Sequence, residues 1–587
     1  MKRFDLDPIT TEQLLRFLSE LEAHQKSEYD ELMALPLEQR IMQGYSMAKL
    51  TVRRTISDGV WLHCGAQIAR YRRGDVISLS SGTTSVIATV LDHRDREILV
   101  QPKKKLDPKT KWTADPVFES FLTVAVKAAQ CVKPMRGQFV LDALNGQPFA
   151  ATTEDGLCDV EGVFAELEAE AGVSLDTSQR QAFFAAAGLP TLWALQGPPG
   201  TGKTRTAAFI GEAVSRASHR VVVVAQSHEA VNRLLTEWKT LFPSRRVIKI
   251  EPSLRVRRGS LIESVSIQAF SKQRKRILAG QPVVGMTVHT ALMLGTYYGY
   301  RADVVLLDEA SQTPLTHGAL LGLLGFAVLM FGDPAQLGAI FPAAVRENPL
   351  AISLMDRYAS IYGLHFLAQT HRLNAPLADI IGRVFYPEAD GLSRLVSTPA
   401  AAVRRLSLGS CVVDPWVADV LNPSHPFVRV QSSERDNRQF SKYEALVVAR
   451  LVHALQACNI AMTAVAVVTP FRQQQQLIAR EIAAVVRGKQ PLVGTAEIMQ
   501  GQSVEVALVS LCVSDLIYLG QIADFFGSCN RWNVALSRAR TKVIVVASNH
   551  LSEALPDFGR AFSCLGHALA LAHLVEDCSP PFPEHMI

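Results

Sequence analysis

The stretch that decides the fold is LWALQ at residues 192–196, which runs directly into GPPGTGKT at residues 197–204. Four apolar residues, a glycine-rich loop and a following helical pattern are typical of a buried strand, a tight turn and the start of a helix. In such a loop the backbone N–H groups approach phosphate oxygens closely, and the helix N-terminus adds positive potential. The spacing G-x-x-x-x-G-K-[ST] therefore predicts a phosphate-binding loop for a nucleoside triphosphate.

Two side chains of this loop have expected roles. Lys203 should reach the β- and γ-phosphates of ATP, and the Thr204 hydroxyl should bind Mg²⁺. The residues expected to hold the nucleotide here are Gly197, Pro198, Pro199, Gly200, Thr201, Gly202, Lys203, Thr204 and Arg205.

A second apolar run, at residues 304–307, ends in the carboxylates of Asp308 and Glu309. A buried strand tolerates charge only at its exposed tip. Asp308 is placed to hold Mg²⁺, directly or through water, and Glu309 is placed to polarise the attacking water as a general base. Such an acidic pair is also common as a helix cap, but beside a phosphate loop the catalytic interpretation is favoured.

Short apolar runs alternate with helical patterns after about residue 171. The first series lies at residues 192–195, 221–225, 304–307 and 328–331, and the second at residues 465–468, 506–511 and 543–547. These runs predict an α/β fold, with parallel sheets that carry helices on both faces, in two tandem domains. Upstream, residues 11–35 have helical spacing, and residues 50–101 have the short alternating segments of a small antiparallel β-barrel.

The DEASQ segment at residues 308–312 resembles the second motif of superfamily 1 helicases. The most similar branch contains the nonsense-mediated-decay and immunoglobulin mu-binding-protein helicases. Other motifs follow in the family's order: LDTSQ at 175–179, GDPAQL at 332–337, THRL at 370–373 and RWNVALSRAR at 531–540. The resemblance implies two RecA-like P-loop domains with an N-terminal stalk and barrel, ATP and Mg²⁺ as cofactors, and 5′-to-3′ movement on single-stranded DNA or RNA.

The resemblance also implies roles for further residues. Gln179 would read adenine, Gln336 would sense the γ-phosphate, and Gly501 would line the nucleotide site. Arg372 and Arg538 also rest on a physical argument. Arginines from a second domain neutralise charge that spreads over the γ-oxygens in the transition state, which is worth ~10³–10⁵ in rate. Hydrolysis then depends on closure of the two domains.

Weaker motif matches predict contacts with the nucleic-acid backbone. Hydroxyls suit phosphate contacts that do not depend on sequence, whereas a helix cap or turn is the equally weighted alternative for each Ser or Thr. The matches are QSHEAVN at 226–232, GMTVHTA at 285–291 and GTAEIMQG at 494–501, and the expected contacts are Ser227, His228, Thr287 and Thr495.

Three features depart from the family pattern. Ser503 stands where relatives have an acid, so a nucleotide contact is missing or is supplied by Glu505. Gly338 and Ala339 replace frequent prolines after the third motif, which puts the coupling of strand separation to hydrolysis in doubt. His371 stands where relatives often have an adenine-stacking tyrosine, and an imidazole stacks more weakly.

Positive charge is concentrated between residues 245 and 276. The net charge of +8 there exceeds the +5 of the whole chain. The segment lies between two predicted backbone-contact motifs, which favours an electrostatic contact with nucleic acid over a merely solvated face. Its basic residues are Arg245, Arg246, Lys249, Arg255, Arg257, Arg258, Lys272, Arg274, Lys275 and Arg276, against Glu251 and Glu263.

Composition places the chain among ordinary globular proteins, with 48% hydrophobic and 20% charged residues. The nine cysteines form no C-x-x-C pair, which argues against zinc and iron–sulfur modules and for reduced thiols. No secretory signal is recognisable, and the longest apolar stretch, 318–332, is shorter than the roughly 18–20 residues that span a bilayer. We therefore expect a soluble cytoplasmic protein, or a nuclear one in a eukaryote, with no membrane partner.

These patterns predict a stalk and barrel at residues 1–170, a first RecA-like domain at 171–345 with a basic insertion at about 242–282, a second at 346–560, and a tail at 561–587. The favoured function is an ATP-dependent helicase or translocase, with protein partners if it works within a larger system. The alternative is an ATP-gated clamp that remodels protein partners on nucleic acid without unwinding duplexes. A P-loop kinase is disfavoured because it leaves the second series of strands unexplained.

Overall fold

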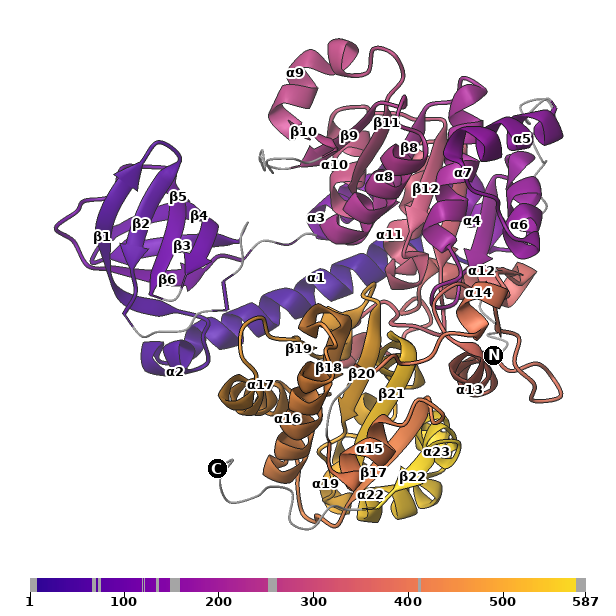
Figure 1. The fold of residues 1–587 in the computed structure, drawn as a ribbon. Helices are drawn as coiled ribbons and strands as arrows, with labels where there is room; N and C mark the ends of the chain where they lie inside the picture. Colours follow the sequence, from indigo (N-terminus) through magenta and orange to yellow (C-terminus); the bar gives the residue numbers. More distant parts are fainter. Residues whose placement is uncertain are drawn as a thin grey trace. The chain divides into compact units, whose positions relative to one another are not determined.

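The computed structural model describes residues 8–65, 70–71, 75–94, 96–118, 120, 122–133, 137–147, 159–251, 261–409 and 413–576. The chain divides into two compact units (Figure 1). The smaller unit is Thr10–Gln130, and the larger unit is Met1–Ile9 together with Cys131–Ile587. Within the described ranges, no helix is both long enough and apolar enough to cross a membrane.

The smaller unit begins with the long helix expected from the sequence. α1 (Thr11–Ala34) starts at a capping box, in which the Thr10 hydroxyl accepts from the Gln13 N–H and the Gln13 side chain accepts from the Thr10 N–H. The helix ends just before Pro36, which cannot continue it. Within the same unit α1 packs against α3 (Leu122–Gln130).

The strands of the smaller unit close into an antiparallel barrel, as expected, in the order β1-β2-β5-β4-β3-β6. The sequence did not predict β6, whose residues lack an apolar run, yet β6 closes the barrel by pairing with both β1 and β3. The strands are β1 (Met47–Ile56), β2 (Gly59–His63), β3 (Val76–Ser81), β4 (Thr84–Arg94), β5 (Glu97–Pro102) and β6 (Trp112–Pro116), and the short helix α2 (Leu37–Met42) precedes them.

The larger unit contains the two predicted parallel sheets. The first has eight strands in the order β10-β9-β11-β8-β12-β13-β7-β14. Its strands are β7 (Leu192–Gln196), β8 (Val221–Ala225), β9 (Val247–Glu251), β10 (Glu263–Ser266), β11 (Val283–Thr287), β12 (Val304–Asp308), β13 (Ala327–Gly332) and β14 (His365–Phe366). β14 pairs with β7 although it lies beyond residue 345, where the sequence placed the domain boundary.

The second sheet has six strands in the order β19-β18-β20-β21-β17-β22. They are β17 (Phe427–Ser432), β18 (Val465–Val468), β19 (Leu492–Gly494), β20 (Val504–Ser510), β21 (Ala539–Ser548) and β22 (His573–Val575), and the small pair β15 (Gln369–Thr370) and β16 (Val396–Ser397) stands apart. Three of the six, β18, β20 and β21, are the predicted strands. The other three were not predicted from the sequence: β19 and β22 are three-residue edge strands, whereas β17 is a six-residue strand between β21 and β22.

Helices cover both faces of the second sheet, which explains why its strands are apolar without alternation. Val465 and Val467 pack in one core with α16 (Lys442–Ala457) and α17 (Arg472–Val485). Their neighbours Ala466 and Val468 belong to the opposite core, which includes residues of α13 (Ala375–Phe385), α21 (Cys529–Leu536) and α23 (Ser563–Ala570). Most residues on either face of the central strands are therefore apolar, and the buried Lys542 of β21 is an exception.

The remaining helices of the larger unit surround the two sheets. In the first half they are α4 (Gln138–Leu144), α5 (Val160–Ala171), α6 (Thr177–Ala187), α7 (Lys203–Arg216), α8 (His228–Leu241), α9 (Ile267–Ile277), α10 (Val288–Tyr297), α11 (Leu315–Ala319) and α12 (Leu354–Tyr362). In the second half they are α13 (Ala375–Phe385), α14 (Pro399–Ala402), α15 (Pro415–Leu421), α18 (Ala496–Met499), α19 (Leu516–Gln521), α20 (Ala523–Phe526), α21 (Cys529–Leu536), α22 (Asn549–Ala554) and α23 (Ser563–Ala570).

A buried acid lies at the carboxyl edge of the second sheet. Glu444, in the first turn of α16, accepts hydrogen bonds from the Ser510 hydroxyl at 2.7 Å and the Cys512 N–H at 3.0 Å. Burial raises its pKa to about 8, although these hydrogen bonds oppose the shift. Glu444 is therefore mostly a neutral acid at pH 7.

The expectation of reduced cysteines is wrong for three of the described cysteines, Cys458, Cys529 and Cys564, which are disulfide-bonded. Cys529 and Cys564 form a disulfide that joins α21 to α23. The two residues are 35 positions apart in the sequence, so no short spacing marks them as partners. Among the described residues Cys64, Cys131 and Cys512 are free thiols.

Candidate nucleotide-binding site

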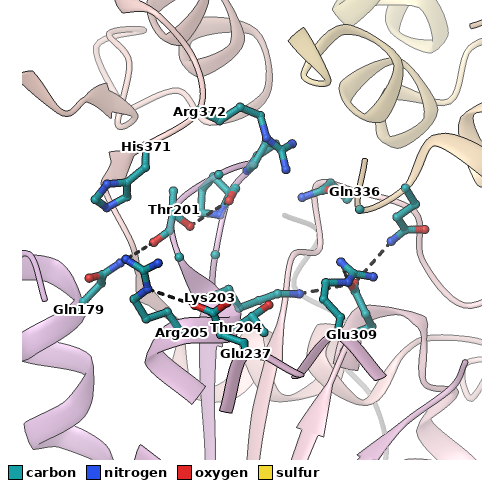
Figure 2. A pocket seen from close by; sticks show the side chains of 18 of the residues that line it. Gln179, Thr201, Lys203, Thr204, Arg205, Glu237, Glu309, Gln336, His371 and Arg372 are labelled. Carbon is teal, nitrogen blue, oxygen red and sulfur yellow. Dashed lines mark hydrogen bonds and ion pairs between the residues drawn. The ribbon is translucent and has the colours of Figure 1, made fainter. Parts of the chain in front are cut away.

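A cavity of about 340 Å³ lies between the phosphate loop and residues that precede strands of the second sheet (Figure 2). It is lined by every residue for which the sequence predicted a nucleotide contact: Gln179, the loop 197–205 and Gly501. Four of the predicted catalytic side chains other than Lys203 line it as well: Glu309, Gln336, Arg372 and Arg538. The fold thus brings together residues that are up to 359 positions apart.

The loop adopts its path because of its glycines. Gly200 and Gly202 have φ angles of 75° and 77°, a region that favours glycine. A Cβ on Gly200 would collide with Arg372, and a Cβ on Gly202 would collide with the amide of Gln179. The Thr201 hydroxyl closes the loop by donating to the Pro198 carbonyl at 2.9 Å. α7 then starts at Lys203, so its N-terminus faces the cavity.

Neighbouring segments hold this loop in place. Gln179, buried in α6, donates to the Thr201 carbonyl at 2.9 Å and accepts from the Asp176 N–H at 3.0 Å. Thr370 donates from its hydroxyl to the Pro199 carbonyl at 2.8 Å. The exposed His371 ring lies 3.4 Å from Asp176 and lines the cavity on the side of Gln179 (Figure 2).

The two acids predicted from the sequence meet the loop lysine. The Lys203 Nζ lies 3.5 Å from Asp308 Oδ1 and 3.4 Å from Glu309 Oε2. Burial by itself lowers the pKa of Lys203, but the two carboxylates outweigh it and raise the pKa above its ordinary value. Burial raises the pKa of Asp308, with Lys203 opposing. For Glu309, burial is outweighed by Lys203 and Arg233, which lower its pKa.

One oxygen of this acid pair is suited to a divalent cation. Asp308 Oδ2 is buried and has no hydrogen-bond partner among the described residues, while Oδ1 accepts from the Glu309 N–H at 2.9 Å. A buried unpartnered carboxylate oxygen is costly unless a ligand satisfies it. Carboxylate and hydroxyl oxygens are the ligands that Mg²⁺ prefers, and Thr204 supplies a hydroxyl in the cavity, which Asp308 itself does not line.

The two predicted arginines converge on the cavity from beyond the first sheet. Arg538 is 1% exposed, and its Nη2 donates to Gln336 Oε1 at 3.3 Å. Arg372 Nη1 donates to the Ser537 carbonyl at 3.2 Å. Neither has a carboxylate within ion-pair distance in the described part of the chain. Burial lowers the pKa of both, to about 10 for Arg538, where Tyr386, Glu309 and Asp333 oppose the shift only in part, and neighbouring arginines lower the pKa of Arg372 further. An anionic ligand would compensate the charge.

A buried network joins the third-motif loop to the second half of the larger unit. Asp333 accepts from the Tyr386 hydroxyl at 2.5 Å and from the Gln336 amide at 2.6 Å. Asn533, in α21, donates to the Tyr386 oxygen at 2.7 Å and to the Ala335 carbonyl at 2.8 Å. Gln336 is therefore positioned by Asp333, and Asp333 by a tyrosine that no sequence signal indicated.

Three further cavity residues were not predicted from the sequence. They are Arg233 and Glu237 on α8, and Gln500 before β20. Arg233 Nη1 lies 3.6 Å from Glu309 Oε1, and Gln500 Nε2 donates to Glu309 Oε2 at 3.4 Å. The signal that could have found the first two is their spacing of four, which places both on one face of a helix.

The predicted nucleic-acid contacts lie at the carboxyl ends of parallel strands, where α/β sheets bind ligands. Ser227 follows β8, Thr287 ends β11 and Thr495 follows β19. Ser227 and Thr287 also cap α8 and α10, accepting from the N–H groups of Ala230 and Thr290. The cap interpretation thus holds for these two residues, and the nucleic-acid contacts stay predictions.

Glu505 does not line the nucleotide cavity, and the nucleic-acid contact expected of the basic segment stays a prediction. Arg540 holds Ser503 at 3.2 Å and Glu505 at 3.3 Å, and neither lines the cavity. In the basic segment Arg246 pairs with Glu263 and Lys249 with Glu251, two acids that the net charge of +8 already includes, and Arg245 pairs with Glu212 outside the segment. Lys272, Lys275 and Arg276 are exposed on α9, whereas Arg255, Arg257 and Arg258 lie outside the described residues.

Two family models, each described as an AAA domain, match residues 174–351 and 350–550. Together the matches include both parallel sheets up to β21 and every lining residue of the cavity.

Curated relatives carry the names of helicases. The chain is 26% identical over 403 residues to the DNA replication ATP-dependent helicase/nuclease JHS1 of Arabidopsis thaliana, covering 65% of this chain and 29% of that protein. It is 25% identical over 427 residues to the ATP-dependent helicase upf1 of Schizosaccharomyces pombe, covering 64% and 44%. It is 24% identical over 440 residues to the DNA polymerase alpha-associated DNA helicase A of the same yeast, covering 64% of each. The chain thus spans less than two thirds of each of these proteins.

A solved helicase structure, arterivirus nonstructural protein 10, aligns with 88% of this chain and 82% of its own at 13% identity, with a low TM-score of 0.39. The order of the sequence motifs, carried across two consecutive AAA-domain matches, makes this chain a member of the superfamily 1 helicases.

Proposed function

We propose that this chain is a nucleic-acid-dependent ATPase that converts ATP hydrolysis into movement along single-stranded DNA or RNA, in the 5′-to-3′ direction. The contact between Arg538 and Gln336 carries the proposal, because it joins the two halves of the larger unit at the cavity. A site completed by two domains hydrolyses its nucleotide only when they approach each other. Such closure is the relative movement that a motor on nucleic acid requires.

The predicted catalytic residues have different roles in hydrolysis. Thr204 and Asp308 would hold Mg²⁺, which when bound supplies positive charge to the phosphate oxygens. Lys203 would bind the β- and γ-phosphates in place of the two acids it now contacts. Glu309 would accept a proton from the attacking water. Arg372 and Arg538 would neutralise the charge that develops on the γ-oxygens.

The adenine would lie toward Gln179 and His371, which line one end of the cavity with Arg205 (Figure 2). The single strand would cross the carboxyl edges of the two sheets at Ser227, His228, Thr287 and Thr495. Hydroxyl contacts of this kind bind phosphates without regard to base sequence, which suits a protein that moves along its ligand.

The test is the rate of ATP hydrolysis with and without single-stranded oligonucleotides. We expect single strands to stimulate hydrolysis, and matched strands of DNA and RNA show which nucleic acid does so. Affinity for the strand should fall steeply with salt, because phosphate contacts release counterions. Hydrolysis that neither strand changes at low salt would contradict the proposal.

A second candidate is an ATP-gated clamp that remodels proteins on nucleic acid. It is favoured by Ser503, which binds Arg540 and does not line the cavity, and by Gly338 and Ala339 in place of prolines. Unwinding of duplexes with 5′ or 3′ tails, measured beside displacement of streptavidin from a biotinylated strand, separates the two. Unwinding of a tailed duplex excludes the clamp, and a requirement for the 5′ tail establishes polarity.

A further inference from the structure

α8 presents two charged side chains to the nucleotide cavity. Arg233 and Glu237 are four residues apart, so they lie on one face of the helix. The opposite face is anchored in the core by buried residues that include Val231, Leu234 and Trp238. Glu237 pairs with Arg205 Nε at 3.2 Å on the floor of the cavity (Figure 2). The helix therefore cannot shift without moving side chains of the site.

Arg233 is placed against the general base. Its Nη1 lies 3.6 Å from Glu309 Oε1, and Glu309 is the acid with which Arg233 pairs within the described ranges. The other partners of the Glu309 carboxylate are Lys203 at 3.4 Å and the amides of Gln312 and Gln500 at 3.4 Å each. Arg233 thus holds one carboxylate oxygen while the other three groups hold the second.

Bound ATP would change the contact of Lys203 with Glu309 but not that of Arg233. The phosphates are expected to draw Lys203 away from the acids. Arg233 comes from a different helix and is confined on its other side by Gly501. A Cβ on Gly501 would lie 2.7 Å from Arg233 Nη1 and 2.8 Å from Cζ, so the guanidinium rests against the bare backbone. Arg233 can therefore keep its hold on Glu309 when Lys203 leaves.

The same helix begins at a predicted nucleic-acid contact. Ser227 caps α8 and is exposed, and His228 is its first residue. Arg233 is six residues after Ser227, or about 9 Å along the helix axis. Because α8 is packed along its buried face, a small displacement of the helix start would be transmitted to Arg233.

We propose that Arg233 is a positioning residue that orients Glu309 and couples it, through α8, to nucleic acid bound at Ser227 and His228. The inference rests on the proposed function, because it needs both a nucleotide and a strand as ligands. A planar guanidinium suits the role, since it can bond a carboxylate edge-on while its face packs on the Gly501 backbone.

Coupling of this kind is measurable without hydrolysis. If the two sites are linked, a nonhydrolysable ATP analogue changes the affinity for the strand by the same factor by which the strand changes the affinity for the analogue. The experiment measures the dissociation constant of a fluorescein-labelled dT20 strand with and without the imido analogue of ATP and Mg²⁺. It compares the wild type with Arg233→Ala, Arg233→Lys, Arg233→Gln and a control, Thr236→Ala, on the exposed side of α8.

We expect the wild type and Thr236→Ala to show the same ratio of affinities, different from one, by about 5-fold or more. Arg233→Ala should bring the ratio to about one, leave the affinity for each ligand alone within about 2-fold, and lower the strand-stimulated kcat by about 10-fold or more with little change in the KM for ATP. Arg233→Lys, which keeps the charge, should recover part of both losses.

Three results would overturn the inference. One is a wild-type ratio in Arg233→Ala. Another is a loss of affinity for strand or analogue alone as large as the loss of kcat, which marks a general structural effect. The third is a full recovery of the ratio in a variant that lacks charge, Arg233→Gln. A wild-type chain that does not bind the strand at all overturns the proposed function as well. The behaviour of the wild type therefore distinguishes a failure of the proposed function from a failure of the role proposed for Arg233.

Discussion

Replacement of Arg538 by alanine tests whether the second half of the larger unit completes the catalytic site. Arg538 is 1% exposed, donates to the Val534 carbonyl at 2.8 Å and reaches Gln336 at 3.3 Å. Burial lowers its pKa to about 10, so the guanidinium is still protonated at pH 7.5. Arg538 therefore brings a full positive charge to the cavity, held in place by the backbone of α21.

The size of the effect follows from that charge. At an effective dielectric constant of about 20, a unit charge roughly 4 Å from a phosphate oxygen is worth about 4 kcal/mol. At about 1.4 kcal/mol per tenfold change in rate, its loss corresponds to roughly a thousandfold fall in kcat. This value lies at the lower end of the ~10³–10⁵ known for arginines that act on a transferred phosphoryl group. ATP affinity should change by less than about 5-fold, because the charge develops on the γ-oxygens mainly in the transition state.

The assay is single-turnover hydrolysis at saturating single strand, with nucleotide affinity measured separately by a fluorescent ATP analogue. Arg540→Ala is the matched control. It removes an arginine two residues away that pairs with Glu505 and does not line the cavity, so its kcat should stay within about 3-fold of the wild type. Arg538→Lys should recover only part of the rate, because a lysine cannot bond the Val534 carbonyl and also reach Gln336.

Two outcomes would refute this reasoning. Arg538→Ala could keep more than about a tenth of the wild-type kcat, which would leave at most about 1.4 kcal/mol for the charge. Alternatively, ATP affinity and kcat could fall by the same factor, in which case Arg538 acts on the bound ground state.

Further predictions concern the phosphate loop, the general base and a buried acid. Lys203→Ala and Glu309→Gln should both abolish turnover, but only Lys203→Ala should weaken ATP binding strongly; equal losses of affinity, measured by fluorescence titration, would contradict the assigned roles. Gly202→Ala should lose nucleotide binding, because the residue has a φ of 77° and the new Cβ would collide with Gln179; wild-type affinity in the same titration would show that the loop adapts. Glu444 has a pKa raised by burial to about 8, against an ordinary value of 4.5, so its contribution to stability is full below pH 4.5 and is lost as pH rises to 8. As pH rises from 6 to 8, the free energy of unfolding of Glu444→Gln should therefore increase relative to that of the wild type by about 1 kcal/mol per pH unit, measured by thermal unfolding. A difference between the two proteins that does not grow with pH would exclude this titration.

Several central strands could be predicted from local sequence alone. The runs at residues 192–195, 221–225 and 304–307 are apolar throughout because both faces of each strand are covered, and such runs are visible without any partner. Edge and short strands lack this signal. β6 closes the barrel and β14 joins the first sheet through pairings that no local pattern shows.

The sequence of the loop at residues 197–204 is enough to predict a phosphate-binding site at the end of β7. Its glycine spacing and lysine are sufficient, because a phosphate-binding turn is built from consecutive residues. The acids that end β12 were predicted in the same way, since a buried apolar strand can carry carboxylates only at its exposed tip, where they can bind a cation or a water.

Tertiary structure alone decided which side chains complete the site. Arg233 reaches Glu309 from 76 positions away, Tyr386 fixes Asp333, and Cys529 meets Cys564. Each of these contacts depends on how helices pack across a sheet. That packing is set by the summed burial of many apolar side chains, so the sequence around the polar residue does not reveal its partner. The sequence thus specified the chemistry that consecutive residues can build, and the fold specified the partners that only packing brings together.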